Sequence, residues 1–161
     1  MTVAGLALLL PSLAYLTDLL IDEIDYYTHK DLYQLPGCYI EIPKIDLIAP
    51  INTVSPNYGV YYDIDTPPPG RPGVTVFFGH RTMFGSPFYR LNELKPGDKV
   101  IVHWFGNTYV YVVYAKEVVS PSYKIPTRSK RDELWLVTCT PPTTSEYRLI
   151  VKCYRVAAEV V

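Results

Sequence analysis

The chain contains 161 residues, of which 48% are hydrophobic and 19% charged. This composition can bury a core and excludes the disordered, collagen-like and coiled-coil classes, and the length suits one globular domain with a short appendage. Fifteen Lys and Arg residues balance sixteen Asp and Glu residues, so the overall charge does not favour a nucleic-acid partner.

The N-terminal residues 1–21 form an apolar stretch that only Asp18 interrupts. Its length is close to the ~20 residues that cross a bilayer as a helix, so we expect a membrane anchor. A cleaved signal sequence and a helix packed on the domain are the alternatives. A signal sequence normally begins with basic residues, however, and this apolar stretch begins without any. Residues 22–37 are expected to be a linker and residues 38–161 a single folded domain.

The folded domain consists of short β-prone segments separated by turns rich in Pro and Gly. Many short strands favour a mainly all-β fold and a closed barrel, because closure removes exposed strand edges. We predict loops over residues 55–73 and 120–133, which contain several prolines. The predicted strands are Tyr39–Ile42, Ile45–Ile51, Val74–Phe78, Lys99–Trp104, Thr108–Val119, Leu134–Cys139 and Arg148–Val156.

A hairpin and one short helix are the clearest local predictions. Apolar residues alternate along the fourth and fifth predicted strands, and Phe105-Gly106-Asn107 between them is typical of a tight turn. Ser86–Leu94 is predicted to be a short helix, because Phe88, Leu91 and Leu94 recur at a spacing of three.

The three cysteines, Cys38, Cys139 and Cys153, are an odd number without the spacing of metal ligands. They predict neither a disulfide framework nor a zinc site, and no metal is expected. A bridge between Cys139 and Cys153 is an alternative that would block the thiol chemistry considered next.

Cys139 ends one apolar strand, His80 follows another, and Arg148 opens the last. A short connection returns the chain antiparallel, so Arg148 and Cys139 are expected side by side. A thiolate is a strong nucleophile, an imidazole can move protons, and a guanidinium can stabilise an oxyanion. The three residues are therefore a candidate catalytic set, with a buried, inert Cys139 as the alternative. Arg81, next to His80, is expected to form a salt bridge or to cap a loop.

Two motifs at the correct separation resemble those of the sortase family, most closely its class E. The first runs from Phe78-Gly79-His80-Arg81-Thr82 to Lys95-Pro96-Gly97-Asp98, and the second joins Leu136-Val137-Thr138-Cys139-Thr140-Pro141 to Arg148-Leu149-Ile150-Val151. The resemblance extends from about Tyr39 to Val156. It departs from the family at Phe78, where a small residue is common.

The resemblance implies a sortase-like closed eight-stranded β-barrel with one or two short helices, preceded by the hydrophobic N-terminal helix. It implies a cysteine transpeptidase in which Cys139 is the nucleophile, His80 the general acid and base, and Arg148 the oxyanion or substrate stabiliser. Thr138, Pro121 and Ile125 would contact the substrate.

By the same resemblance, the substrate is a surface protein with a Leu-Pro-x-Thr-Gly or Leu-Ala-x-Thr-Gly sorting signal. The amine acceptor is a cell-wall precursor or a pilin lysine, and no cofactor is expected. The enzyme would contact membrane lipid through its N-terminal helix and act on the extracellular face of the cell membrane. A non-catalytic surface binding module and a cysteine protease of the same fold are the alternatives.

Overall fold

The computed structural model describes residues 13–18, 20–21, 24–25, 28–29, 31–82 and 86–157. The chain divides into two compact units, residues 1–32 and residues 33–161. Residues 1–12 and 19 of the predicted anchor lie outside the described residues, as does Gly85. The described residues of the first unit are helical, and none of the helices among them is both long and apolar enough to span a membrane.

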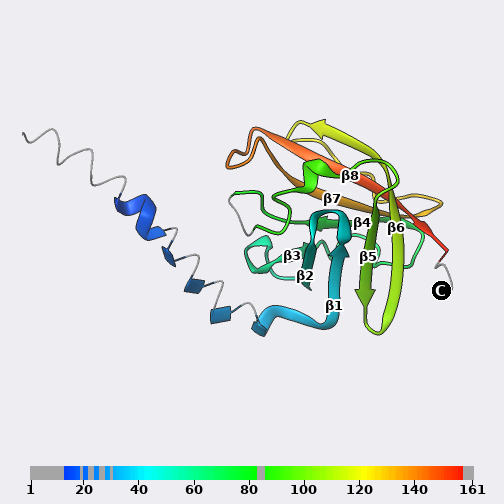
Figure 1. Ribbon diagram of the computed structural model, residues 1–161, viewed down its shortest axis with the longest axis horizontal. Coiled ribbons are helices and arrows are strands. Elements are labelled where there is room, and N and C mark those ends of the chain that lie inside the picture. The colour runs from blue at the N-terminus through cyan, green and yellow to red at the C-terminus, as the bar shows by residue number, and fades with distance from the viewer. Residues whose placement is uncertain are drawn as a thin grey trace, which may run out of the picture. The chain divides into compact units, whose positions relative to one another are not determined.

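The second unit is a closed barrel with the strand order β1-β2-β3-β4-β7-β8-β6-β5 (Figure 1). The pairs β2–β3 and β4–β7 are parallel, and the other neighbouring strands are antiparallel. This confirms the predicted mainly β, closed eight-stranded barrel. The strands are β1 (Gln34–Ile42), β2 (Leu47–Asn52), β3 (Val60–Tyr62), β4 (Gly73–Phe78), β5 (Lys99–Trp104), β6 (Asn107–Val119), β7 (Asp132–Thr140) and β8 (Tyr147–Val156).

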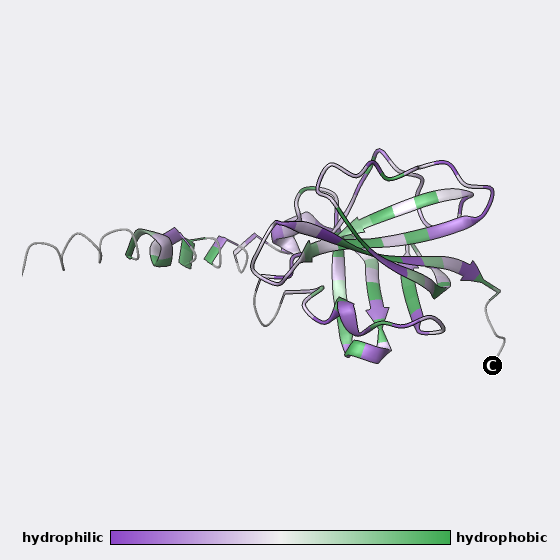
Figure 2. Cartoon of the chain, turned by 90° about the horizontal axis from the view of Figure 1, so that it is seen from above, coloured by the Kyte–Doolittle hydropathy of each residue, from purple (hydrophilic) through white to green (hydrophobic). Residues whose placement is uncertain are grey.

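Alternation along the strands gives the barrel two separate apolar clusters, and Figure 2 shows the alternating hydropathy along several strands. On β7, Leu134 and Leu136 face the interior, whereas Trp135 and Val137 belong to a second cluster outside it. The same alternation on β4 and β8 adds Val74, Val76 and Ile150 to this outer cluster. An outer face that is also apolar must be covered, and the segment between β6 and β7 lies over it.

The predicted hairpin is confirmed as β5 and β6. Trp104 pairs with Asn107, so only Phe105 and Gly106 form the turn, and both have positive φ angles, 45° and 84°. A two-residue turn with two positive φ angles matches the twist of the flanking strands, and glycine adopts this conformation without strain. The inward alternation ends after Val113, where β6 carries an irregularity opposite Cys153 and Lys152.

Two predicted local structures need correction. β3 lies inside the proline-rich stretch 55–73 that we predict to be a loop, because its three residues contain no proline and pair with the preceding strand β2 and the following strand β4. The predicted helix Ser86–Leu94 is a series of turns followed by a 3-10 helix, η3 (Leu91–Glu93), although Phe88, Leu91 and Leu94 are fully buried. A spacing of three is the period of a 3-10 helix.

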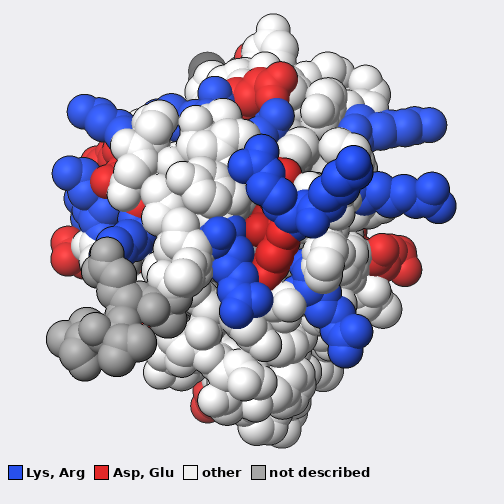
Figure 3. Space-filling view, turned by 90° about the vertical axis from the view of Figure 1, so that its right-hand side faces the viewer, with Lys and Arg blue, Asp and Glu red and all other residues white. Residues whose placement is uncertain are grey.

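The other two 3-10 helices among the described residues are η1 (Pro43–Ile45) and η2 (Pro56–Tyr58). β1 begins at Gln34, so residues 34–37, which we assigned to the linker, form part of the barrel. Basic and acidic side chains are interspersed on the face shown in Figure 3. Ion pairs on the barrel include Arg155 with Asp132 and Lys152 with Glu117.

Candidate functional site

The three candidate catalytic residues come from the ends of three neighbouring strands, β4, β7 and β8. Cys139 and Arg148 are direct cross-strand partners in the antiparallel β7–β8 pair. The parallel β4–β7 pair has Phe78 opposite Val137. His80 and Cys139 each lie two residues beyond this last pair, so His80 follows the end of β4 on the side of β7 away from Arg148. The order His80, Cys139, Arg148 across the sheet follows from the barrel topology.

Hydrogen bonds fix the chain on either side of these residues. The Gly79 amide donates to the Val137 carbonyl at 3.1 Å, and the Thr138 hydroxyl donates to the Gly79 carbonyl at 2.7 Å. A Cβ atom would not fit at Gly79, because the Phe88 ring lies 2.5 Å from the position that it would occupy. The segment that carries His80 is therefore held against both β7 and the turn at Phe88.

The side chains of His80 and Arg148 are also held in place. His80 Nε2 lies 2.6 Å from Asn57 Oδ1, and Arg148 Nη1 donates to the carbonyls of Ser145 and Tyr147, each at 3.2 Å. We did not predict Asn57 from the sequence. The only signal was Ser55-Pro56-Asn57, which favours a turn but does not indicate which side chain the turn approaches.

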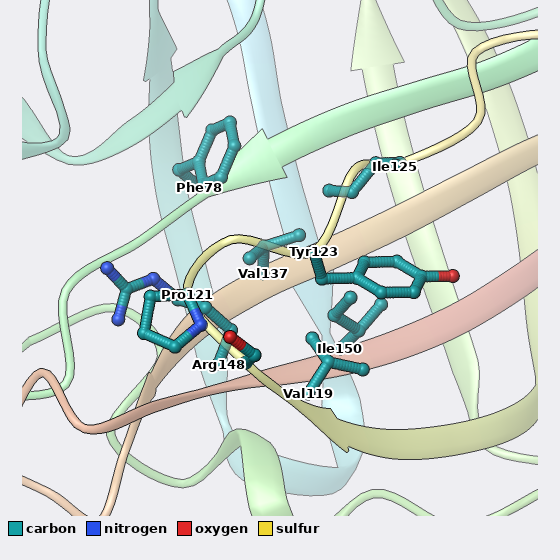
Figure 4. A pocket seen from close by; sticks show the side chains of 9 residues that line it. Phe78, Val119, Pro121, Tyr123, Ile125, Val137, Arg148 and Ile150 are labelled. Atoms are coloured by element: carbon teal, nitrogen blue, oxygen red, sulfur yellow. The ribbon is translucent and has the colours of Figure 1, made fainter.

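Next to this strand end lies a groove of about 150 Å³ on the outer face of the barrel (Figure 4). Its floor comes from β4, β7 and β8, and the segment after β6 crosses above it. Both residues expected in the groove, Pro121 and Ile125, line it. The lining residues are Phe78, Val119, Ser120, Pro121, Tyr123, Ile125, Val137, Arg148 and Ile150.

Thr138, which we predicted to contact the substrate, is not among the residues that line this groove. Its side chain is 3% exposed, and its hydroxyl is bonded to Gly79. The Thr138 side chain therefore links β7, which carries Cys139, to the segment that carries His80.

All three cysteines are free, so the alternative of a Cys139–Cys153 bridge is wrong. Cys153 faces Leu134, five positions along β7 from Cys139 and therefore about 17 Å away. Burial raises the pKa of Cys38 and of Cys153, whereas Cys139 is partly exposed. Within the described part of the chain, no group of three or more His, Cys, Asp or Glu residues is arranged to hold a metal ion.

A carboxylate anchors the segment that covers the groove. Glu133, 8% exposed, accepts hydrogen bonds from Ser129, from Trp135 and from Tyr114. Burial alone would raise the pKa of Glu133, but these three bonds and the nearby Arg131 charge outweigh it and lower the pKa. Burial together with the neighbouring carboxylate raises the pKa of Tyr114 to about 12.

Comparison with known proteins agrees with this geometry. Residues 40–156 match the family model for the sortase domain. The chain is 31% identical over 137 residues to sortase SrtE1 of Streptomyces coelicolor; the match covers 70% of this chain but only 38% of that relative's length.

Solved sortase structures share the fold. A lid mutant of sortase A from Corynebacterium diphtheriae matches with a TM-score of 0.72 and 29% identity, over 79% of this chain and 73% of that one. Sortase C-1 from Actinomyces oris matches with a TM-score of 0.69 and 32% identity, over 74% and 73%. The fold similarity to solved sortases, the two motifs at the ends of β4 and β7, and the family match over residues 40–156 show that the chain belongs to the sortase family.

Proposed function

We propose that this protein is a cysteine transpeptidase that cleaves a sorting signal and joins the cleaved chain to an amine. The observation that carries the proposal is the pairing of Cys139 with Arg148 directly across two strands, beside the strand end that presents His80. The adjoining groove, most of whose lining residues are apolar, provides a surface for a peptide.

In the first half-reaction, the Cys139 thiolate attacks the carbonyl carbon of the threonine in the signal, whose bond to the glycine nitrogen will break. The tetrahedral intermediate carries an oxyanion, which the Arg148 guanidinium stabilises as a hydrogen-bond donor. When the C–N bond breaks, the His80 imidazolium gives its proton to the departing amine, and a thioester to Cys139 remains.

In the second half-reaction, the neutral amine of the acceptor attacks the thioester carbonyl. His80 takes a proton from the amine, the C–S bond breaks, and the thiolate of Cys139 is released with a new amide bond formed. The same imidazole thus donates a proton in one step and accepts one in the next, so the enzyme returns to its starting state.

The groove supports a signal of the Leu-Pro-x-Thr-Gly or Leu-Ala-x-Thr-Gly kind. Phe78, Val137 and Ile150 form an apolar floor, and Pro121 and Ile125 lie in the covering segment. These residues would contact the apolar side chains of the signal while Arg148 contacts its backbone. The acceptor would be the amine of a cell-wall precursor or of a pilin lysine.

We also propose that the enzyme acts at the outer face of the cell membrane and contacts lipid through its N-terminal segment. The support is that large apolar side chains of the first unit, including Leu13, Leu16, Ile21 and Leu32, are 54–73% exposed to solvent. Sedimentation of the full chain with phospholipid vesicles tests this. A protein that stays in the supernatant at all lipid concentrations would contradict it.

The reaction is tested by incubating the full chain with peptides of both signal types and a primary amine, followed by mass spectrometry. We expect a thioacyl adduct on the enzyme and a peptide joined to the amine. Cys139→Ala abolishes both products but keeps the wild-type melting temperature. Iodoacetamide labels the native enzyme once, at Cys139, because Cys38 and Cys153 are only 2% and 0% exposed.

Other outcomes identify the alternatives. A hydrolysed peptide without amine transfer, even at high amine concentration, indicates a cysteine protease. Peptide binding that is equal in wild type and Cys139→Ala, with no cleavage in either, indicates a binding module.

A further inference from the structure

Arg81 is a buried cation that the proposed reaction does not use. The residue is 6% exposed and follows His80 directly. Its Nε donates to the Tyr89 carbonyl and its Nη1 to the Thr140 hydroxyl, each at 3.0 Å. Of the two roles expected from the sequence, the structure shows the loop cap, and no ion pair to Arg81 occurs among the described residues.

The absence of a carboxylate partner in the described chain is unusual, because a buried guanidinium is normally paired with an anion. Removing the charge from water is unfavourable, and two uncharged acceptors compensate for it less well than a carboxylate would. The position of Arg81 therefore calls for an explanation other than an ion pair.

The position of Arg81 is special because of where the β4–β7 pairing ends. The last register pair of these two parallel strands is Phe78 with Val137. His80 and Cys139 both lie beyond it, so the strand ladder itself does not fix their separation. Besides the bond from the Gly79 amide to the Val137 carbonyl, two side chains join these segments beyond the ladder: Thr138, which is bonded to Gly79, and Arg81, which is bonded to Thr140.

Arg81 makes two connections to the segment that carries Cys139. Besides the bond from its side chain to Thr140, its carbonyl accepts from the Thr143 amide at 3.1 Å. The residue after His80 is thus joined to the residue after Cys139 and to the β7–β8 connection. The third bond, to Tyr89, holds the same guanidinium against the turn before η3.

We propose that Arg81 is a positioning residue, which clamps the end of β4 to the end of β7 and thereby sets the distance between His80 and Cys139. This rests on the proposed function, since it concerns the geometry of the same reaction. The planar guanidinium directs donors at Tyr89 and Thr140 simultaneously, whereas the single ammonium of lysine cannot reproduce that fork.

The test compares Arg81→Lys, Thr140→Val and Thr140→Ser in the full chain, with Thr144→Val as the matched control. Thr144 lies in the same connection, but its hydroxyl donates to Pro141, at 2.8 Å, and not to Arg81. Single-turnover formation of the thioacyl enzyme, KM and melting temperature are measured for each variant.

We expect Arg81→Lys and Thr140→Val to form the thioacyl enzyme at least ten-fold more slowly, with KM changed less than two-fold. Thr140→Ser keeps the hydroxyl and Thr144→Val keeps the clamp, so both should stay within two-fold of wild type. Arg81→Met and the double variant Arg81→Met/Thr140→Val are measured in the same way. The double variant should be no slower than Arg81→Met, because Arg81→Met already removes the bond to Thr140 that Thr140→Val removes. A lower melting temperature with unchanged acylation by the folded protein would overturn the proposal, as would losses that multiply in the double variant.

Alkylation separates failure of the clamp from failure of the proposed function. If wild type forms no thioacyl enzyme, the proposed function fails, but the reaction of Cys139 with iodoacetamide still reports on its surroundings. The clamp predicts that this reaction slows at least three-fold in Arg81→Lys and Thr140→Val and not in Thr140→Ser. Equal alkylation rates in all variants would refute the clamp.

Discussion

Asn57 orients the side chain of His80 through a short hydrogen bond. Asn57 Oδ1 lies 2.6 Å from Nε2, so a proton on Nε2 is held there. The turn that presents Asn57 is itself rigid, because buried Asn52 accepts from the amides of Val54 and Ser55. Asn57 is therefore placed by the fold.

We expect Asn57→Ala to lower the rate of thioacyl formation roughly three- to ten-fold, the loss that corresponds to one net hydrogen bond. Asn57→Asp keeps an acceptor oxygen at the same position and should retain most of the rate. Single-turnover kinetics of the two variants provide the measurement. A rate for Asn57→Ala equal to that of wild type would show that His80 is oriented without Asn57.

Phe78, where we expect a departure from the small residue common in the family, forms part of the groove floor. Its ring lies 6.1 Å from that of Tyr61, stacked against β3. Phe78→Ala removes this bulk and should shift preference towards the larger proline, raising the ratio of kcat/KM for Leu-Pro over Leu-Ala peptides at least about three-fold. Competition between the two peptides, read by mass spectrometry, measures the ratio; an unchanged ratio would mean that Phe78 only fills space.

Among the elements, the segment between β6 and β7 is held to the barrel by Glu133. Because hydrogen bonds lower its pKa in the folded protein, the Glu133 carboxylate stabilises the fold fully above its usual pKa of 4.5. That contribution is lost as the pH falls through the lower folded pKa. Asp132, whose pKa is raised by burial, changes stability in the opposite direction over a similar range.

A comparison with Glu133→Gln isolates this contribution from that of Asp132. The variant should be less stable than wild type by about 1–2 kcal/mol at pH 7, and the difference should shrink as the pH is lowered below 4.5. Urea unfolding at a series of pH values gives both free energies of unfolding. A difference that stays constant or grows towards acid pH would show that the carboxylate is not the stabilising form.

At the scale of the whole molecule, the buried core that the described residues form runs from Cys38 to Cys153, within the second unit. Because this core lies in the second unit, we expect removal of residues 1–32 to leave the melting temperature within about 2 °C of that of the full chain. For a domain of this length, such a shift corresponds to less than about 1 kcal/mol in the free energy of unfolding. Thermal unfolding followed by circular dichroism measures this. A fall of 10 °C or more would mean that the first unit contributes to the stability of the barrel.

The candidate site is accessible to solvent although the strands that carry it are buried, because the site lies at the ends of these strands. β4, β7 and β8 are apolar on both faces where they cross the molecule, and the candidate residues appear only where these strands end. Chemistry at strand ends combines a rigid support with access for a peptide.

The sequence by itself was sufficient for the barrel, the hairpin, the approximate positions of most strands, and the adjacency of Cys139 and Arg148. These features follow from alternation with period two and from short connections, which are local properties. The tertiary structure alone decided that β3 is a strand, that Asn57 meets His80 across 23 residues of sequence, and that Arg81 meets Thr140 rather than an acid. Closing a barrel pairs segments remote along the chain, and which side chains then meet depends on registers that no local pattern encodes.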